Sequence, residues 1–273
     1  MIADKHVHSP FCPHGTKDRF EDYIERAFEL GIKEITFTEH APLPVSFPEP
    51  IPEKDSGMKP GNLPLYLKEA ARVKDYYKTA LAVRIGLEVD FIEGFEKETK
   101  ELLDETGPYL DDSILSVHFI RDGSSWHCID YSADMFGGIV SSYGSAEAVY
   151  QRYYDTVELA VEEDLGLYKP KRIGHLTLIH KFQKAYPVSR NFDPLVFRLI
   201  DKIYSRKLSL DYNGAGFVKP LCREPYPPER FARYAMELGV PLVFGSDAHQ
   251  AKDLGQGYGQ LLREFREKHT NHM

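Results

Sequence analysis

Apolar and polar residues follow one repeated pattern along the chain, a short apolar run and then an amphipathic stretch, and the pattern occurs seven times. The apolar runs have the length of buried strands, and the amphipathic stretches place apolar residues at helical spacing. Strands are predicted over residues 1–7, 35–38, 82–89, 113–120, 172–178, 208–212 and 242–245. Helices are predicted over residues 18–30, 65–79, 94–106, 146–165, 194–204, 228–238 and 259–268.

Strands that alternate with helices of ten or more residues form right-handed βαβ units and a parallel sheet. Seven such units predict a barrel of the TIM-like (β/α) kind, with its active site at the carboxyl ends of the strands. An open doubly wound sheet is the alternative. Because no shift of composition marks a boundary, we expect residues 1–273 to form a single domain.

One stretch interrupts the pattern between the second strand and the following helix. Residues 41–64 contain seven prolines and show no periodicity. A structureless stretch of this length inside a compact domain is more often functional than accidental, so we interpret it as a loop that serves the site. A rigid surface excursion is the alternative interpretation.

Composition narrows the classes of function and location. The 42 acidic residues outnumber the 34 basic ones, giving a formal charge of −8, which weighs against a nucleic-acid partner. The chain opens with MIADKHVHS, without a charged and apolar leader, and lacks an apolar run of membrane-spanning length. We therefore expect a soluble, cytoplasmic protein with no membrane partner. The three cysteines are widely spaced and form no CxxC pair, so any metal ligands should be nitrogen and oxygen.

The histidines gather at the predicted strand ends. His6 and His8 have the spacing that places two side chains on one face of a strand. His14 lies in the loop that follows. The other strand-end candidates are His40, Glu88, His118, His175, Asp247 and His249.

Seven imidazoles and two carboxylates at one rim of a barrel form a ligand set suited to zinc, manganese or iron. Glu88 or Asp247 could bridge two cations. A single strand histidine is more often a hydrogen-bonded core residue than a ligand, but the complete set would require several coincidences. The remaining histidines, interpreted as surface or supporting residues, are His127, His180, His269 and His272.

The motifs DKHVH, TEH, GLEVD, SVHF, RIGH and SDAH resemble those of the polymerase-and-histidinol-phosphatase (PHP) family of metal-dependent phosphoesterases. The segments HSPFCPHG, ITFTEHAPLP and PLVFGSDAHQA, among others, are similar to PHP-type histidinol-phosphate phosphatases, and the likeness covers nearly the whole chain. The resemblance implies a distorted (β/α)7 barrel, a trinuclear metal centre, and hydrolysis of L-histidinol phosphate to L-histidinol and inorganic phosphate in histidine biosynthesis.

The resemblance also implies a division of the ligands among two or three divalent ions. Its three groups are His6, His8, Glu88 and Asp247 for one ion, Glu88, His118 and His175 for a second, and His14, His40 and His249 for a third.

The mechanism that follows is direct in-line attack of metal-bound hydroxide on the phosphate monoester. Asp247, Glu88 and His249 are the candidate catalytic residues, with Asp247 positioning the hydroxide and passing a proton to the leaving alcohol. Loops beyond the strand ends supply candidate cations for the phosphate, and Asp90 or Asn213 could bind the imidazole and amine of the substrate. The cation candidates are Arg121, Lys181, Arg190 and Arg223.

Three other functions compete with this hypothesis. A PHP-type nuclease or nucleotide phosphatase would use the same chemistry on another substrate. An amidohydrolase-type barrel also carries H-x-H on its first strand, but no lysine stands at the strand end where such enzymes carry their carboxylated lysine. A non-catalytic metal-binding domain would hold the same cluster for structural reasons.

Overall fold

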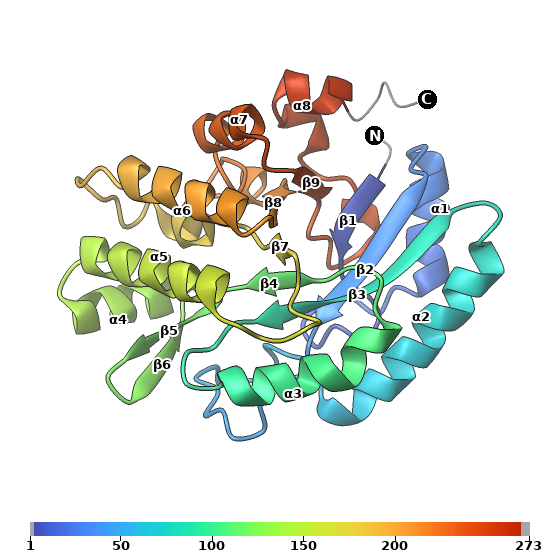
Figure 1. Ribbon diagram of the computed structural model, residues 1–273, viewed down its shortest axis with the longest axis horizontal. Coiled ribbons are helices and arrows are strands. Elements are labelled where there is room, and N and C mark those ends of the chain that lie inside the picture. The colour runs from blue at the N-terminus through green and yellow to red at the C-terminus, as the bar shows by residue number, and fades with distance from the viewer. Residues whose placement is uncertain (1–2, 269–273) are drawn as a thin grey trace.

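Parallel strands surrounded by helices form a barrel in this computed structural model, which describes residues 3–268 (Figure 1). Seven strands pair in parallel in the order in which they occur along the chain. They are β1 (Ala3–Val7), β2 (Glu34–His40), β3 (Ala82–Asp90), β4 (Ile114–Ser116), β7 (Arg172–Ile173), β8 (Ser209–Asn213) and β9 (Leu242–Gly245). The predicted (β/α)7 barrel is confirmed.

Hydrogen bonds just past the ends of β1 and β9 bring the two edges of the sheet together. The His8 amide donates to the Ala248 carbonyl at 2.9 Å, and the Asp247 amide donates to the His6 carbonyl at 2.8 Å. The barrel is therefore nearly closed, and the contact that closes it is made by the H-x-H and D-x-H motifs.

Helices follow most strands and cover the outside of the barrel (Figure 1). In α1, for example, Phe20, Ile24 and Ala27 recur at helical spacing and are buried. Two more helices begin at serines that cap them, since Ser132 and Ser145 accept hydrogen bonds from backbone amides in the first turn. The helices are α1 (Phe20–Glu29), α2 (Leu63–Tyr77), α3 (Glu96–Thr106), α4 (Ala133–Tyr143), α5 (Ala146–Glu162), α6 (Asp193–Ser205), α7 (Glu229–Leu238) and α8 (Arg263–Lys268). No helix among residues 3–268 is both long and apolar enough to span a bilayer.

The fourth strand is shorter than the sequence pattern predicts. The apolar run 113–120 reads as one strand, but the chain leaves the barrel after Ser116 and enters an antiparallel hairpin of β5 (Phe119–Asp122) and β6 (Ser125–Cys128). The hairpin turns at Gly123, whose φ of 56° suits a two-residue turn. The two turn positions are occupied by the Gly-Ser pair in RDGSSW, which is a hairpin-turn signal. The sequence prediction missed both the hairpin and α4, and it missed the hairpin because the continuous apolar run conceals the break.

The fifth strand is also shorter than predicted. β7 covers two residues of the predicted 172–178, and the chain continues into a 3-10 helix, η3 (Leu178–Phe182). Gly174 lies so close to β4 that a Cβ there would approach the Ser116 hydroxyl to 2.1 Å. Because β4 and β7 end early, His118 and His175 lie just past their strands. There the side chains do not have to alternate between the two faces of a sheet, so both can point into the mouth of the barrel.

The proline-rich segment 41–64 packs beside the hairpin and holds one short 3-10 helix, η1 (Pro60–Asn62). Phe47 and Ile51 are buried in a small cluster with Phe119 of β5. The Tyr131 hydroxyl fixes the segment further by donating to Glu53 at 2.8 Å. The segment is thus an ordered arm along one side of the barrel mouth.

Candidate metal centre

All nine predicted ligands lie together at the carboxyl end of the barrel. β1 supplies His6, and the loop after β1 supplies His8 and His14. His40 and Glu88 lie at the carboxyl ends of β2 and β3, and the other four ligands lie just past β4, β7 and β9. Atoms of His6, His8 and Asp247 lie within 4.8 Å of one another, and the same holds for Glu88, His118 and His175. The parallel arrangement of the strands therefore brings the six motifs together in one cluster.

Glu88 stands at the centre of the cluster, and its two carboxylate oxygens face different histidines. Oε2 lies 3.4 Å from His6 Nε2 and 3.2 Å from His40 Nδ1. Oε1 lies 2.9 Å from His175 Nε2 and 3.9 Å from His118 Nε2. The side chain is 1% exposed. A carboxylate placed in this way has the geometry of a bridging ligand.

Asp247 enters the cluster from the turn after β9. Its φ of 55° is unusual for a residue other than glycine, and such backbone strain is typical of functional sites. Oδ1 lies 3.1 Å from His8 Nε2 and 3.7 Å from His6 Nε2. The Asn213 amide donates to the other oxygen at 3.3 Å. This turn and the Asn213 contact aim the carboxylate at the H-x-H pair.

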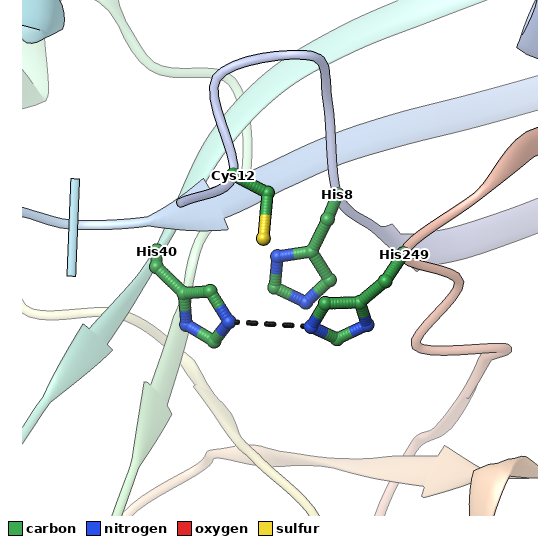
Figure 2. A group of neighbouring side chains, drawn as sticks. All are labelled: His8, Cys12, His40 and His249. Atoms are coloured by element: carbon green, nitrogen blue, oxygen red, sulfur yellow. Dashed lines mark hydrogen bonds between the residues drawn. The ribbon is translucent and has the colours of Figure 1, made fainter. Parts of the chain in front are cut away.

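A third group of imidazoles lies at the outer side of the cluster. His249 Nε2 is 3.4 Å from His40 Nε2 and 3.2 Å from His14 Nε2. Figure 2 shows His40 and His249 turned toward each other, with His8 and the Cys12 sulfur beside them. The Cys12 thiol, which was not among the predicted residues, is buried, and that burial raises its pKa and favours the protonated form.

Further carboxylates behind the cluster hold three of the imidazoles through their Nδ1 atoms. Such outer partners fix the orientation of a ligating histidine and leave Nε2 directed at the ion. The pairs are His6 with Asp211 at 2.8 Å, His8 with Glu39 at 3.3 Å, and His118 with Asp90 at 2.8 Å. Glu39 and Asp211 were not predicted, although each lies at the end of a strand that the sequence reveals.

The buried charges shift the pKa values of the cluster in opposite directions. Burial alone would raise the pKa of Glu88, but the neighbouring His6 and His175 outweigh it and hold that pKa well below its usual range. Burial likewise opposes protonation of His8 and His118, but the carboxylates beside them raise these pKa values to about 9 and about 10. Glu88 is thus ionised, and its negative charge favours a cation in the pocket.

The spacing of the ligand atoms fits divalent cations. Two atoms that each lie about 2.1 Å from one ion are separated by about 3.0 to 3.4 Å at octahedral or tetrahedral angles. Several pairs described above fall in or near this range. In addition, His6 Nε2 is buried without a hydrogen bond while it faces carboxylates of Glu88 and Asp247. A cation between these groups would satisfy all three.

Comparison with known proteins agrees with this geometry. The PHP domain family matches residues 4–213, and the PHP-associated family matches residues 227–269. The chain belongs to the PHP family. It is 46% identical to the histidinol-phosphatase of Bacillus subtilis (strain 168), over 95% of this chain and 97% of that protein.

Solved structures extend the likeness of this PHP chain to three dimensions. A crystal structure from Listeria monocytogenes, assigned as a histidinol phosphatase, is 38% identical, covers 95% of this chain and all of that one, and gives a TM-score of 0.92. The Lactococcus lactis histidinol phosphate phosphatase, in complex with zinc, L-histidinol and phosphate, gives a TM-score of 0.66 at 21% identity, covering 92% of this chain and 87% of that one, which is a likeness of fold.

A cavity of about 500 Å³ opens from the PHP cluster toward solvent. Its wall contains both hydrophobic and polar side chains, and the proline-rich segment contributes Ile51, Asp55 and Ser56. Lys181 of η3 lines it and pairs with Asp130 at 3.0 Å. Lys219, which the sequence did not single out, lines the same wall from the loop after β8.

The other candidate cations and Asn213 lie elsewhere. Arg121 stacks on Trp126 and faces Glu93, and Arg190 stacks on Phe192 beside a separate surface cavity. Arg223 donates to a backbone carbonyl at an exposed turn. Asn213 is fully buried behind the ligands, so it contacts Asp247 and does not line the cavity.

Two of the four histidines that were predicted to lie outside the cluster fall within the described residues. His180 is buried and hydrogen-bonds Glu224 at 2.7 Å, and His127 is partly exposed on β6. His269 and His272 lie outside the described residues.

Proposed function

We propose that this PHP chain is a phosphoric monoester hydrolase that converts L-histidinol phosphate to L-histidinol and inorganic phosphate. The observation that carries the proposal is the placement of Glu88, with each oxygen facing a separate group of imidazoles. The Bacillus subtilis relative, which is named a histidinol-phosphatase, matches nearly the entire chain and supports this choice of substrate.

Two or three divalent ions, of zinc, manganese or iron, fit the donor set, in the three groups that the family resemblance implies. When bound, such ions lower the pKa of water and neutralise phosphate oxygens. Glu88 would hold two of them by its separate oxygens. His14, His40 and His249 would hold the third, with His14 and His249 already 3.2 Å apart.

The chain's own residues would position the reactants around these ions. Asp247 Oδ2 is held by the Asn213 amide, so the carboxylate is fixed where it can accept a proton from the attacking water and return it to the leaving alcohol. The pKa of Asp247 lies well below its usual range because His6 and His8 outweigh the effect of burial. It is therefore ionised at neutral pH.

Two lysines are suited to the outer oxygens of the phosphate. Burial would lower the pKa of Lys181, but Asp130 outweighs it and raises the pKa, so the ammonium stays charged in the cavity wall. Lys219 has no side-chain partner among the described residues and lines the same cavity. We propose these two cations in preference to Arg121 and Arg190, because the two arginines do not line the cavity.

The chain is proposed to act as one domain in the cytoplasm. The main hydrophobic core joins residues of both matched segments, for example Val7 with Phe231 and Phe265, which supports a single folding unit over 1–273. The three cysteines are buried and unpaired, as is usual in a reducing compartment.

A nuclease or nucleotide phosphatase is the competing activity for this site, and kinetic preference separates the two. Purified protein, reconstituted in turn with zinc, manganese and iron, should release phosphate from L-histidinol phosphate with a kcat/KM at least about a hundredfold above that for a nucleoside bisphosphate. A short oligonucleotide should remain uncleaved. Comparable or better turnover of either nucleotide substrate would contradict the proposal.

A further inference from the structure

The wall of the cavity carries more carboxylates than are needed to complete the ligand cluster and to pair with the lysines. Six acidic side chains line it, although the proposed substrate brings a phosphate dianion. A substrate with a positively charged group elsewhere would account for an unused carboxylate. The lining carboxylates are Asp55, Glu88, Asp90, Asp130, Asp247 and Asp253.

Five of these carboxylates are already engaged. Glu88 and Asp247 face the imidazoles of the cluster, and Asp90 accepts a hydrogen bond from His118. The remaining two engaged carboxylates have partners in the wall itself. Asp130 pairs with Lys181, and Asp253 accepts from the Gln250 amide at 2.6 Å.

Asp55 differs from the other five because its carboxylate has no partner among residues 3–268. It lines the cavity from the proline-rich segment and is partly exposed. An ionised carboxylate in a concave wall, without a protein partner, is free to accept a charge-assisted hydrogen bond from a bound cation. The side chain is therefore available to a ligand in a way that the other five are not.

The backbone of Asp55 is fixed to the metal cluster. Its carbonyl accepts a hydrogen bond from His14 Nδ1 at 2.9 Å, which leaves His14 Nε2 facing His249. One residue thus orients a predicted ligand through its backbone and presents its carboxylate to the cavity.

The segment around Asp55 is held on both sides. The Ser56 amide donates to Glu49 at 2.9 Å, and Glu53 accepts from the Tyr131 hydroxyl. The pKa of Tyr131 is raised, mainly by that hydrogen bond, and the negative charge of Asp55 adds to the effect. Asp55 and Tyr131 line the same cavity.

We propose that Asp55 is the residue that binds the ammonium group of the substrate and so selects amine-bearing phosphate esters. This inference rests on the proposed function and adds the specificity determinant to it. With the phosphate at the metal cluster, the ammonium of L-histidinol phosphate lies two carbons from the ester oxygen. Asp55 is the carboxylate of the cavity wall that has no protein partner among residues 3–268 and is left to receive it.

The test compares two substrates that differ by the amine alone. Kinetics are measured with L-histidinol phosphate and with 3-(imidazol-4-yl)propyl phosphate, for wild type and for Asp55→Asn. The asparagine keeps the carbonyl that holds His14, so metal content, checked by elemental analysis, should be unchanged. Loss of one charge-assisted hydrogen bond predicts that kcat/KM for L-histidinol phosphate falls roughly 10- to 100-fold, mainly through KM. The amine-free ester should change less than about twofold.

Glu53→Gln is the matched control. It removes one negative charge from the same segment and retains an oxygen that can accept from Tyr131, and both substrates should behave as with wild type. Asp55→Glu should recover part of the lost selectivity. An equal effect of Asp55→Asn on both esters, or no effect on either, would overturn the assignment of Asp55 and leave the proposed function standing. A wild-type protein that hydrolyses both esters equally well would also overturn only the selectivity assigned to Asp55, whereas a metal-loaded wild type that hydrolyses neither would overturn the proposed function.

Discussion

The His6 imidazole lies 2.8 Å from the Asp211 carboxylate, and both side chains are completely buried. Asp211 ends up there because β8 lies next to β9 at the edge that meets β1. Burial would lower the pKa of His6, but the charges of Asp211, Glu88 and Asp247 outweigh burial and raise it. Asp211 thereby fixes His6 with Nε2 directed at the cluster.

Replacement of Asp211 by asparagine should weaken metal binding without removing a ligand. Loss of an outer partner of a ligating histidine usually costs about 10- to 100-fold in affinity. We expect a shift of that size in a competition titration with a chelator, together with lower activity that excess metal restores. Asp201→Asn is a suitable control, because Asp201 contacts Tyr234 at the surface. Equal affinity in Asp211→Asn and wild type would contradict the role of Asp211.

Replacement of Glu88 by glutamine should be far more damaging. Glutamine has a similar shape but carries one oxygen and no charge, so it cannot serve two ions. We expect loss of at least one bound ion per chain and a fall in activity of about a hundredfold or more. Glu101→Gln removes an exposed charge on α3 and should match wild type in metal content and turnover. Full metal content and normal turnover in Glu88→Gln would refute the bridging assignment.

Metal binding should release protons. In the metal-free protein the pKa values of His8 and His118 are about 9 and about 10, so both imidazoles are protonated at pH 7.5. Ions bind only the neutral form, so uptake must displace these protons. A pH indicator in weakly buffered solution should report the release, which declines as pH rises through 9 and then 10. Metal affinity should rise with pH below 9 and level off above 10, and uptake without proton release would contradict this prediction.

The same shifts affect the stability of the metal-free protein. Because both folded-state pKa values lie above the ordinary value of 6.5, these histidines stabilise the fold fully below pH 6.5. Their contribution is lost as pH rises through 9 and 10. Denaturant titrations of the chelator-treated, metal-free protein should therefore show a lower free energy of unfolding at pH 10 than at pH 7. Saturating metal should abolish this decrease. An equal decrease in the free energy of unfolding with and without metal would show that groups other than His8 and His118 cause the pH dependence.

The Tyr66 hydroxyl contributes to the stability of the barrel. Its buried hydroxyl lies 2.9 Å from the Phe37 carbonyl and 2.8 Å from the Gly86 carbonyl, which ties α2 to β2 and β3. Tyr66→Phe should lower the free energy of unfolding by about 1–3 kcal/mol, with little effect on metal content. Tyr76 is 73% exposed on the same helix, so Tyr76→Phe should leave stability unchanged. Denaturant titration of metal-loaded protein compares the two, and equal stabilities would contradict the role assigned to Tyr66.

Periodicity of the sequence was sufficient for the order of strands and helices but insufficient for the places where the chain leaves the barrel. β9 matches its predicted bounds, since a short apolar run ends there at a Gly-Ser pair. β4 and β7 are shorter than predicted, because Val117 and Leu176 remain buried outside the strands and keep the pattern apolar. Burial alone does not distinguish a strand from a packed loop.

The site was predictable to the extent that strand ends define it. His6, Glu88 and Asp247 could be placed together because parallel strands end on one rim. The outer partners Glu39 and Asp211 were missed, since a buried carboxylate at a strand end reveals its partner only once strand pairing and register are known. Loop residues were the hardest to place, as Lys219 and Asp55 illustrate, because the path of a loop depends on packing between distant segments.

Glu88 is proposed to bridge metal ions at the mouth of the barrel. Anomalous diffraction from crystals of the metal-loaded protein, collected at the absorption edge of the ion, tests it most directly. We predict one ion between Glu88 Oε2 and the His6 and His8 imidazoles, and a second between Glu88 Oε1 and the imidazoles of His118 and His175. Anomalous density that lies away from Glu88, with both carboxylate oxygens in hydrogen bonds to protein groups only, would contradict the account.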